Sequence, residues 1–304
     1  MSAELFVIAG PTASGKSQYA LDLANKVGGE IINADAIQVY QEIPILSCAP
    51  SIADTKSITH HLYNYISVTD DYSVGKYIQD AVTAINNVTS SGKVPILVGG
   101  TGMYIKSLCY GIHDIPEITA EIRANTRSKF QELGNEKFYD ELRQLDPIGA
   151  AQIHQSNSQR VIRYYEIFMQ TGHSIVEFYK DKPQSFLQNY DIKTIILEPE
   201  RKMLYDRCDK RFIAVLDNAL EEVAYVCSLY DEYTAAEKAI GFNELKAYLA
   251  NTISKDEAIA LAQARTRQYA KRQMTWFRHQ IDDAIRIEFD NILPSIDHIL
   301  GATK

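Results

Sequence analysis

The chain has 304 residues, of which 46% are hydrophobic and 23% charged, and its formal net charge is −8. This composition is typical of a globular protein and argues against a disordered, fibrous or low-complexity chain. At this length we expect a core with a subordinate domain. No apolar run approaches the roughly 20 residues that cross a bilayer, so we expect no membrane partner.

The amino terminus and the cysteines indicate the compartment. The chain runs from Met1 into an apolar stretch without the pattern of a signal peptide. Its cysteines, Cys48, Cys109, Cys208 and Cys227, form no C-x-x-C pair, so the sequence predicts neither a zinc site nor a disulfide framework. We therefore expect a cytoplasmic protein with reduced thiols.

Residues 10–17 read GPTASGKS and fit the phosphate-loop pattern G-x-x-x-x-G-K-[ST], between an apolar run (5–9) and a helical pattern (18–26). The glycines let backbone N–H groups face oxyanions, Lys16 adds a cation, and the Ser17 hydroxyl can hold Mg²⁺. The pattern does not distinguish a nucleotide from another diphosphate. The predicted phosphate-binding residues are Gly10, Pro11, Thr12, Ala13, Ser14, Gly15, Lys16 and Ser17.

Apolar runs over residues 30–34 and 94–98 alternate with a helical pattern over 75–88. Short apolar strands separated by helices predict an α/β fold, a parallel sheet with helices on both faces. Ligands of such sheets bind beyond the carboxyl ends of the strands. The phosphate loop and two polar segments, residues 35–38 and 99–102, should meet there.

Asp35 follows the second of these strands and should lie beside the phosphate loop. From its position alone, the carboxylate could act as a general base, help to hold Mg²⁺ or cap a helix. Thr101 offers a hydroxyl at the end of the 94–98 strand, which lacks the metal-binding Asp of many P-loop NTPases. Adjacent His60 and His61 have no third ligand nearby, so we expect packing there.

After residue 108 the pattern becomes helical, with helices expected over 117–133, 136–145 and 158–171. We interpret residues 114–188 as an inserted all-helical domain, within a P-loop core made of residues 1–113 and 189–304. An apolar run over 192–197 predicts another strand of the sheet. Helices should follow over 200–229 and from Ser254 towards Ile287.

Basic residues gather in two segments although the total charge is negative. Residues 263–280 hold five Lys or Arg and no acid, and residues 201–211 hold five against Asp206 and Asp209. Arg207 and Arg211 share a helix face, where they could clamp a phosphate or pair with those acids. The mixture of cations and aromatics in the first segment fits nucleic acid binding, and equally a helix with one apolar face.

The sequences GPTASGKS, ILVGGTGMY and TRQYAKRQMTWFR occur in this order, together with residues 32–40 and 158–163. With these motifs the chain resembles the bacterial tRNA dimethylallyltransferases, also called tRNA isopentenyltransferases, over nearly its whole length. The resemblance implies transfer of a dimethylallyl group from dimethylallyl diphosphate to N6 of adenine 37, in tRNAs reading codons that begin with U. It also implies Mg²⁺ as cofactor, tRNA as partner and a monomer.

The family pattern implies roles for individual residues. Asp35 would be the general base towards the adenine N6. The departing diphosphate would be stabilised, with Mg²⁺ at Ser17, by Thr12, Lys16, Ser17 and Arg211. The residues implied to contact tRNA are Asp35, Ala36, Ile37, Gln38, Thr101, Arg123, Gln159, Arg160, Val161, Ile162, Arg163, Lys238, Gly241, Arg267, Lys271 and Arg272.

The chain departs from the family pattern at three places. Ala36 follows Asp35 where Ser is common, residues 46–50 read LSCAP in place of G-T-A-K-P, and Phe242 stands where Tyr is frequent. Ala49 stands where the family pattern has the lysine, and we expect this difference to weaken the contact with tRNA or to alter substrate choice.

Three other functions remain open at this point. A P-loop kinase of a small substrate would require ATP turnover, and it leaves the helical insertion and the basic stretch without a role. An adenylate dimethylallyltransferase would keep the chemistry and change the acceptor. A non-catalytic nucleotide-dependent RNA-binding module would keep its activity in Asp35→Ala.

Overall fold

The computed structural model describes residues 2–233, 235–288 and 292–301. The chain forms two compact units. The core unit comprises Met1–Cys109 and Phe186–Lys304, and the helical unit comprises Tyr110–Ser185. The sequence analysis placed the insertion at residues 114–188. Within the described residues, no helix has the length and apolar character required to cross a bilayer.

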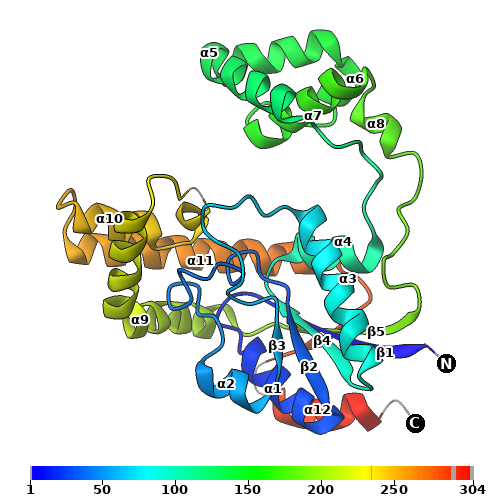
Figure 1. The fold of residues 1–304 in the computed structure, drawn as a ribbon, viewed down its shortest axis with the longest axis vertical. Coiled ribbons are helices and arrows are strands. Elements are labelled where there is room, and N and C mark those ends of the chain that lie inside the picture. The colour runs from blue at the N-terminus through cyan, green and yellow to red at the C-terminus, as the bar shows by residue number, and fades with distance from the viewer. Residues whose placement is uncertain (1, 234, 289–291, 302–304) are drawn as a thin grey trace. The chain divides into compact units, whose positions relative to one another are not determined.

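The core unit is built on one sheet of six strands in the order β3-β2-β4-β1-β5-β6, with every neighbouring pair parallel (Figure 1). The strands are β1 (Ala3–Ala9), β2 (Gly29–Asn33), β3 (His60–His61), β4 (Val94–Gly99), β5 (Tyr190–Leu197) and β6 (Ile285–Ile287). The helices are α1 (Lys16–Val27), α2 (Ile52–Ser57), α3 (Val74–Ser90), α4 (Gly102–Tyr110), α9 (Arg201–Leu229), the 3₁₀ turn η1 (Ala236–Lys238), α10 (Phe242–Leu249), α11 (Lys255–Gln280) and α12 (Ile292–Gly301). The predicted parallel α/β fold is confirmed.

Strand β1 shows how the sheet acquires two buried faces. Leu5 and Val7 join an apolar cluster with residues of α3, α4 and α11, whereas Phe6 and Ile8 join another with residues of α1 and α12. Successive side chains of a strand point to opposite faces, so a continuously apolar strand needs helices on both. All four side chains are fully buried.

The register of the sheet brings three strand ends together. Ala9 at the end of β1 pairs with Gly99 at the end of β4, and Asn33 at the end of β2 pairs with Val98. The segments that leave these strands are the phosphate loop, the segment after Asn33 and the turn before α4. They therefore emerge at one edge of the sheet, as predicted from the sequence.

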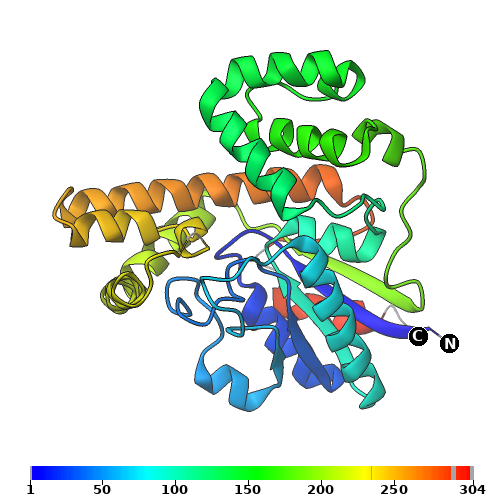
Figure 2. The ribbon, with the colours of Figure 1, turned by 45° about the horizontal axis from the view of Figure 1, so that its top comes forward.

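A third apolar cluster joins helices α9, α10 and α11 to the segment that follows β2 (Figures 1 and 2). Phe212 and Leu216 of α9 and Phe242 of α10 pack there with Val39 and Leu46. Phe242 is fully buried, at the position where the family pattern favours Tyr. This cluster holds the segment after β2 against α9.

The sequence prediction for the end of α11 was wrong. The helix ends at Gln280, and Ile285–Ile287 forms the edge strand β6 beside β5. Ile281 is extended and buried in the core, which ends the helix. The Arg286 guanidinium then donates to the carbonyl oxygens of Phe277 and Ile281, at 3.2 and 2.7 Å, satisfying acceptors that the helix end leaves open.

The helical unit contains α5 (Ala120–Leu145), α6 (Pro147–Ala150), α7 (Ser158–Thr171) and α8 (Ile175–Phe178). The two helices expected over 117–145 are confirmed: α5 consists of two helices that meet in a kink at Gly134, whose backbone is non-helical (φ 72°, ψ 170°). The unit has its own apolar core, in which Phe138, Leu142 and Val161 are fully buried. It is therefore a separate compact body.

Replacing Arg286 tests how the end of α11 is stabilised. Because Arg286→Ala removes charged hydrogen bonds to two carbonyls and to Glu198, we expect the free energy of unfolding to fall by about 1 to 3 kcal/mol. Urea unfolding followed by fluorescence of Trp276, the one tryptophan of the chain, measures this in the core unit. Arg278→Ala, an exposed residue of the same helix, is the control. Equal stability of the two variants would contradict the capping role.

Candidate active site

The phosphate loop places unpaired helix donors at the end of β1. Gly10 and Gly15 have positive φ values of 151° and 91°, and a Cβ at Gly10 would lie 2.7 Å from the Leu197 carbonyl oxygen. Gly15 caps α1 without a side-chain hydrogen bond. The first N–H groups of α1 are therefore available to an anion, which the helix dipole also favours.

Lys16 lies among these donors. Its Nζ donates to the Pro11 carbonyl oxygen at 2.7 Å. Burial lowers the pKa of Lys16 to about 8, an effect opposed by the Asp35 carboxylate and reinforced by the Arg211 guanidinium. An anion bound beside this ammonium would raise its pKa again, so ligand binding and protonation of Lys16 are coupled.

Thr12 is fixed on two sides by residues distant in sequence. Its backbone N–H donates to Gln273 Oε1 at 2.8 Å, and its hydroxyl accepts from Arg211 at 2.5 Å. Arg207 lies one turn before Arg211 on α9, and both line a cavity beside phosphate-loop residues 12–17. Asp209 pairs with Arg267, at 2.7 and 2.8 Å, so it is not the partner of Arg211, and the phosphate contact expected of Arg207 or Arg211 stays a prediction.

Asp35 is held in place by its own backbone neighbourhood. The Asn33 side chain accepts from the Asp35 N–H at 2.8 Å and donates to the Asp35 carbonyl oxygen at 3.1 Å. One carboxylate oxygen, Oδ1, accepts from the Ile37 N–H at 2.9 Å. Thr101 Oγ1 accepts from the Ala36 N–H at 2.9 Å, which ties this turn to the end of β4.

The groups around Asp35 are kept in defined protonation states. Burial, with the Asp35 charge as the second cause, raises the pKa of Tyr63 and Tyr269 above the usual range for tyrosine. Both phenols are therefore neutral at physiological pH. The Asp35 carboxylate also acts on Lys16, where it opposes the lowering of the lysine pKa by burial.

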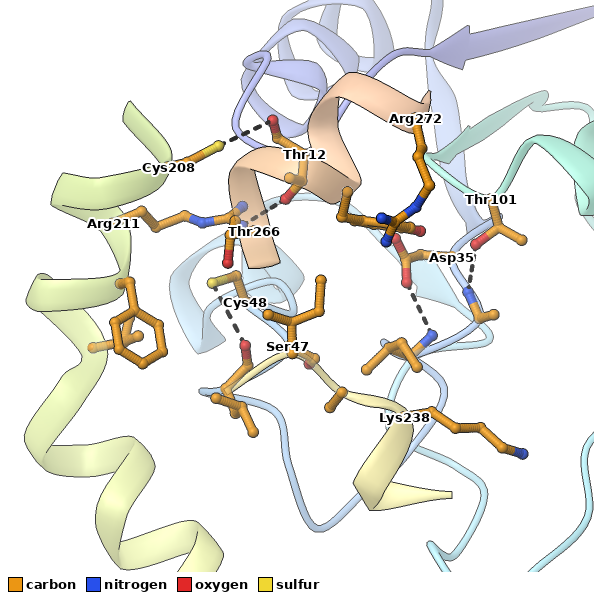
Figure 3. A pocket seen from close by; sticks show the side chains of 18 residues that line it. Thr12, Asp35, Ser47, Cys48, Thr101, Cys208, Arg211, Lys238, Thr266 and Arg272 are labelled. Atoms are coloured by element: carbon orange, nitrogen blue, oxygen red, sulfur yellow. Dashed lines mark hydrogen bonds between the residues drawn. The ribbon is translucent and has the colours of Figure 1, made fainter. Parts of the chain in front are cut away.

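Two cavities meet at Asp35. The first, of about 390 Å³, is lined by phosphate-loop residues 12–17 and Arg207, and we call it the loop cavity. The second, of about 360 Å³, is shown in Figure 3; its lining includes the apolar side chains of Leu46, Phe212 and Val215, and we call it the apolar cavity. Both are lined by Thr12, Asp35, Ser47, Cys48 and Arg211. A ligand with an anionic end and an apolar end would fit across the junction.

The core unit brings several of the predicted RNA-contacting residues to the apolar cavity. They are Asp35, Ala36, Ile37, Thr101, Lys238 and Arg272, of which Lys238 and Arg272 are exposed. Lys271 is exposed on α11 beside Arg272, where both line a shallow hollow with Trp276. Gln38 lines the loop cavity, and its amide donates to the carbonyl oxygens of Ser47 and Cys48.

Other predicted contacts lie elsewhere. Gly241 is buried at the start of α10, with a φ of 101° and its N–H donating to Glu244. The Arg267 guanidinium is taken by Asp209. Neither residue lines the loop cavity or the apolar cavity.

The remaining predicted contacts belong to the helical unit. Gln159 and Arg160 are exposed at the start of α7, Ile162 is half-buried, and Arg123 of α5 is partly exposed. Arg163 pairs with Glu166 at 3.6 Å. Val161 is fully buried in the core of the unit, so its side chain is not available to RNA, and a contact through its main chain stays a prediction.

Gln273 is a site residue that the sequence analysis missed. Only 5% exposed, it accepts from the Thr12 N–H and donates from Nε2 to the Gly100 carbonyl oxygen at 2.8 Å. A Cβ at Gly100 would lie 2.4 Å from Gln273 Nε2, so a larger residue there would displace the Gln273 amide. The available signal was an amide on the face of α11 that Ala270 and Phe277 also share, spaced by three and four residues.

The parallel sheet, the phosphate loop and the paired cavities define a P-loop α/β enzyme. The IPP transferase family model matches residues 38–280. The chain belongs to the tRNA dimethylallyltransferase family and is an enzyme of that class.

Relatives and solved structures agree with this assignment. The tRNA dimethylallyltransferase of Rickettsia bellii is 45% identical over 95% of this chain and 92% of its own length. That of Orientia tsutsugamushi (strain Boryong) is 41% identical over 95% of each chain. The tRNA delta(2)-isopentenylpyrophosphate transferase of Staphylococcus epidermidis matches with a TM-score of 0.70 and 32% identity, over 99% of this chain and 98% of its own. A eukaryotic dimethylallyltransferase acting on tRNA has a TM-score of 0.83 and 27% identity, over 99% of this chain and 80% of its own.

Diphosphate binding should be linked to protonation of Lys16. The pKa of Lys16 is about 8, so about half of its side chains are neutral at pH 8 and about a tenth at pH 7. When a bound anion restores the charge, Lys16 therefore takes up about half a proton at pH 8 and about a tenth at pH 7. Calorimetry with inorganic diphosphate, in two buffers of different ionisation enthalpy, should show this excess uptake in the wild type relative to Lys16→Met. Lys210→Met, an exposed lysine of α9, is the control and should match the wild type. Equal proton uptake in wild type and Lys16→Met at pH 8 would contradict the role of Lys16.

Gln273→Leu tests the bracing of the phosphate loop. The change leaves the Thr12 N–H and the Gly100 carbonyl without their partner, so we expect a loss of about 1 to 3 kcal/mol in the free energy of unfolding. Gln268→Leu, an exposed glutamine of the same helix, should change it by about 0.5 kcal/mol or less. Urea unfolding measures both. Similar losses in the two variants would mean that the brace contributes nothing.

Proposed function

We propose that the protein transfers a dimethylallyl group from dimethylallyl diphosphate to N6 of adenine 37, in tRNAs reading codons that begin with U. The products are N6-dimethylallyladenosine and diphosphate. The observation that carries the proposal is the position of Asp35, which lines both the cationic loop cavity and the apolar cavity. The names of the relatives support tRNA as the acceptor.

The proposed reaction divides between the two cavities. The diphosphate lies in the loop cavity against the N–H groups of α1, Lys16 and Arg211, and the dimethylallyl group extends into the apolar cavity. The adenine leaves the anticodon-loop stack to reach Asp35. As N6 bonds to C1 of the dimethylallyl group, the C1–O bond breaks, Asp35 takes the N6 proton, and the diphosphate leaves with the bonding electrons.

The leaving group determines what the cations contribute. Negative charge develops on the diphosphate oxygen as the C–O bond breaks, and fixed donors aimed at that charge stabilise the transition state more than the ground state. Arg211, held by the Thr12 hydroxyl, and Lys16 are the donors placed for this. Thr12 orients Arg211 through the hydrogen bond that its hydroxyl accepts, and the same hydroxyl can donate to the diphosphate.

The residues of the loop cavity fit Mg²⁺ bound together with the diphosphate. Ser17 is exposed in this cavity, and the described part of the chain holds no group of three His, Cys, Asp or Glu side chains that could bind a metal. Mg²⁺ commonly takes one or two ligands from the protein and the rest from phosphates and water. We propose the Ser17 hydroxyl as the protein ligand. When bound, the ion would neutralise charge on the diphosphate.

The proposal extends to the RNA and to the state of the protein. The exposed cations Lys238, Lys271 and Arg272 support RNA binding at the mouth of the apolar cavity, because phosphate contacts dominate the affinity of proteins for RNA. In the helical unit, Gln159 and Arg160 are the exposed candidates. We propose a cytoplasmic monomer, since one chain lines both cavities.

The acceptor is tested by incubating the protein and Mg²⁺ with dimethylallyl diphosphate and either an anticodon stem-loop RNA containing adenine 37 or free AMP. Mass spectrometry of the digested products locates any dimethylallyl group. The proposal predicts an adduct on adenine 37 of the RNA. An adduct on AMP alone would make the protein an adenylate dimethylallyltransferase, and ATP consumption with a small molecule in place of any adduct would make it a kinase.

Asp35→Asn tests the general base. The amide keeps an oxygen for the Ile37 N–H and loses the proton acceptor, so the single-turnover transfer rate should fall by about 10² to 10⁴-fold. Diphosphate affinity should change little. Asp70→Asn, exposed and outside both cavities, should retain wild-type activity. A rate within a few-fold of wild type for Asp35→Asn would rule out Asp35 as the base.

A further inference from the structure

A half-buried carboxylate on α9, that of Glu222, binds the main chain at the wall of the apolar cavity. Glu222 Oε1 accepts from the Ile45 N–H at 2.7 Å, and Oε2 accepts from the Leu46 N–H at 2.8 Å. Burial raises the pKa of Glu222, and the two N–H donors oppose this shift. Glu222 lines neither cavity, so the reaction proposed above gives it no role.

The segment that Glu222 holds, residues 44–48, overlaps residues 46–50, where the chain departs from the family's G-T-A-K-P pattern. Inside the segment, the Cys48 N–H donates to the Ile45 carbonyl oxygen at 3.0 Å, and Cys48 has a positive φ of 54°. On the other side, the Gln38 amide donates to the carbonyl oxygens of Ser47 and Cys48, at 3.1 and 2.7 Å. The Glu222 carboxylate thus holds the segment through two backbone N–H groups, and the Gln38 amide holds it through two carbonyl oxygens.

The held segment faces the apolar residues of α9. Along that helix the lining changes from Arg207 in the loop cavity, through Arg211 in both cavities, to Val215 in the apolar cavity alone. At about 1.5 Å per residue, Val215 lies about 6 Å beyond Arg211 along the axis. A short prenyl chain whose diphosphate contacts Arg211 would therefore end beside Phe212 and Val215, opposite Leu46.

Leu46 and Phe212 pack closely against the start of α10. A Cβ at Gly241 would lie 2.8 Å from the Phe212 ring and 3.1 Å from Leu46 Cδ1. Leu46 is 8% exposed and belongs to the same apolar cluster as Phe212 and Phe242. Leu46 therefore contributes an apolar side chain to the cavity lining from a closely packed position, and Glu222 holds its main chain.

We propose that Glu222 is a positioning residue: by holding the amides of Ile45 and Leu46 it fixes the apolar wall, and thereby restricts the transferred group to a short prenyl chain. This inference rests on the proposed function, because it takes a prenyl diphosphate as the donor. It assigns Glu222 no contact with the substrate. Its effect is on which substrate fits.

The specificity test compares dimethylallyl diphosphate with geranyl diphosphate, which is longer by one isoprene unit, as donors to the anticodon stem-loop RNA. In Glu222→Ala the ratio of kcat/KM for geranyl to that for dimethylallyl diphosphate should rise about tenfold, because Leu46 is released. Glu222→Gln, which keeps one acceptor and the side-chain volume, should lie between this variant and the wild type. Glu221→Ala, an exposed glutamate next in sequence, is the matched control and should behave as wild type.

A second measurement is independent of catalysis. Cys48 and Cys227 are both half-buried, and peptide mass spectrometry resolves their alkylation by N-ethylmaleimide. Release of the segment should speed labelling of Cys48 about tenfold in Glu222→Ala and leave Cys227 unchanged. If the wild type transfers no dimethylallyl group, the proposed function fails, whereas the labelling still decides whether Glu222 holds the wall.

The contradicting result is a folded Glu222→Ala protein with wild-type labelling of Cys48 and an unchanged ratio between the two donors. That would show that the carboxylate only adds stability. If Glu222→Ala does not fold, the same two measurements on Glu222→Gln decide the question. Its Cys48 labelling and donor ratio should then both exceed those of Glu221→Ala, and equality would overturn the proposal.

Discussion

The register of the parallel sheet is the constraint on which the site depends. With Ala9 opposite Gly99 and Asn33 opposite Val98, the phosphate loop, Asp35 and Thr101 leave the sheet at one level. A Cβ at Gly99 would lie 2.0 Å from the Ala34 carbonyl oxygen, so the ends of β2 and β4 approach as closely as glycine permits. A slip of one residue would turn every side chain of a strand to the other face and separate Asp35 from the loop.

Long side chains from the second half of the chain lock the loops that this register brings together. Arg211 and Glu222 of α9 hold Thr12 and the Ile45–Leu46 amides, and Gln273 of α11 holds Thr12 from the other side. These contacts add to the hydrogen bonds within the loops, such as those from the Ser47 and Cys48 N–H groups to the carbonyl oxygens of Ile43 and Ile45. The core unit is therefore completed only when the residues after the helical unit pack on those before it.

The local parts of this arrangement could be predicted from the sequence, and the long-range parts could not. Continuous apolar runs identified the main strands, and glycine spacing identified the phosphate loop, because both signals lie within a few residues. The two-residue strand β3 is too short to show a period. The end of α11 depends on Ile281 and Arg286, which follow the helix. Gln273 forms hydrogen bonds with Thr12 and Gly100, which lie 261 and 173 residues away in the chain, and no local sequence pattern predicts such contacts. The burial of Val161, in contrast, could have been predicted, because its spacing of three and four residues from Tyr164 and Tyr165 places all three on one face of α7.

The central claim is that the diphosphate and the target adenine meet at Asp35 from two adjoining cavities. The most direct measurement is a crystal structure with a non-reactive dimethylallyl thiodiphosphate and an anticodon stem-loop RNA. The account predicts the diphosphate oxygens on the N–H groups of α1 and on Arg211, with adenine N6 about 2.6 to 3.2 Å from an Asp35 carboxylate oxygen. An adenine that stays stacked in the RNA loop, or lies in the complex away from Asp35, would contradict it.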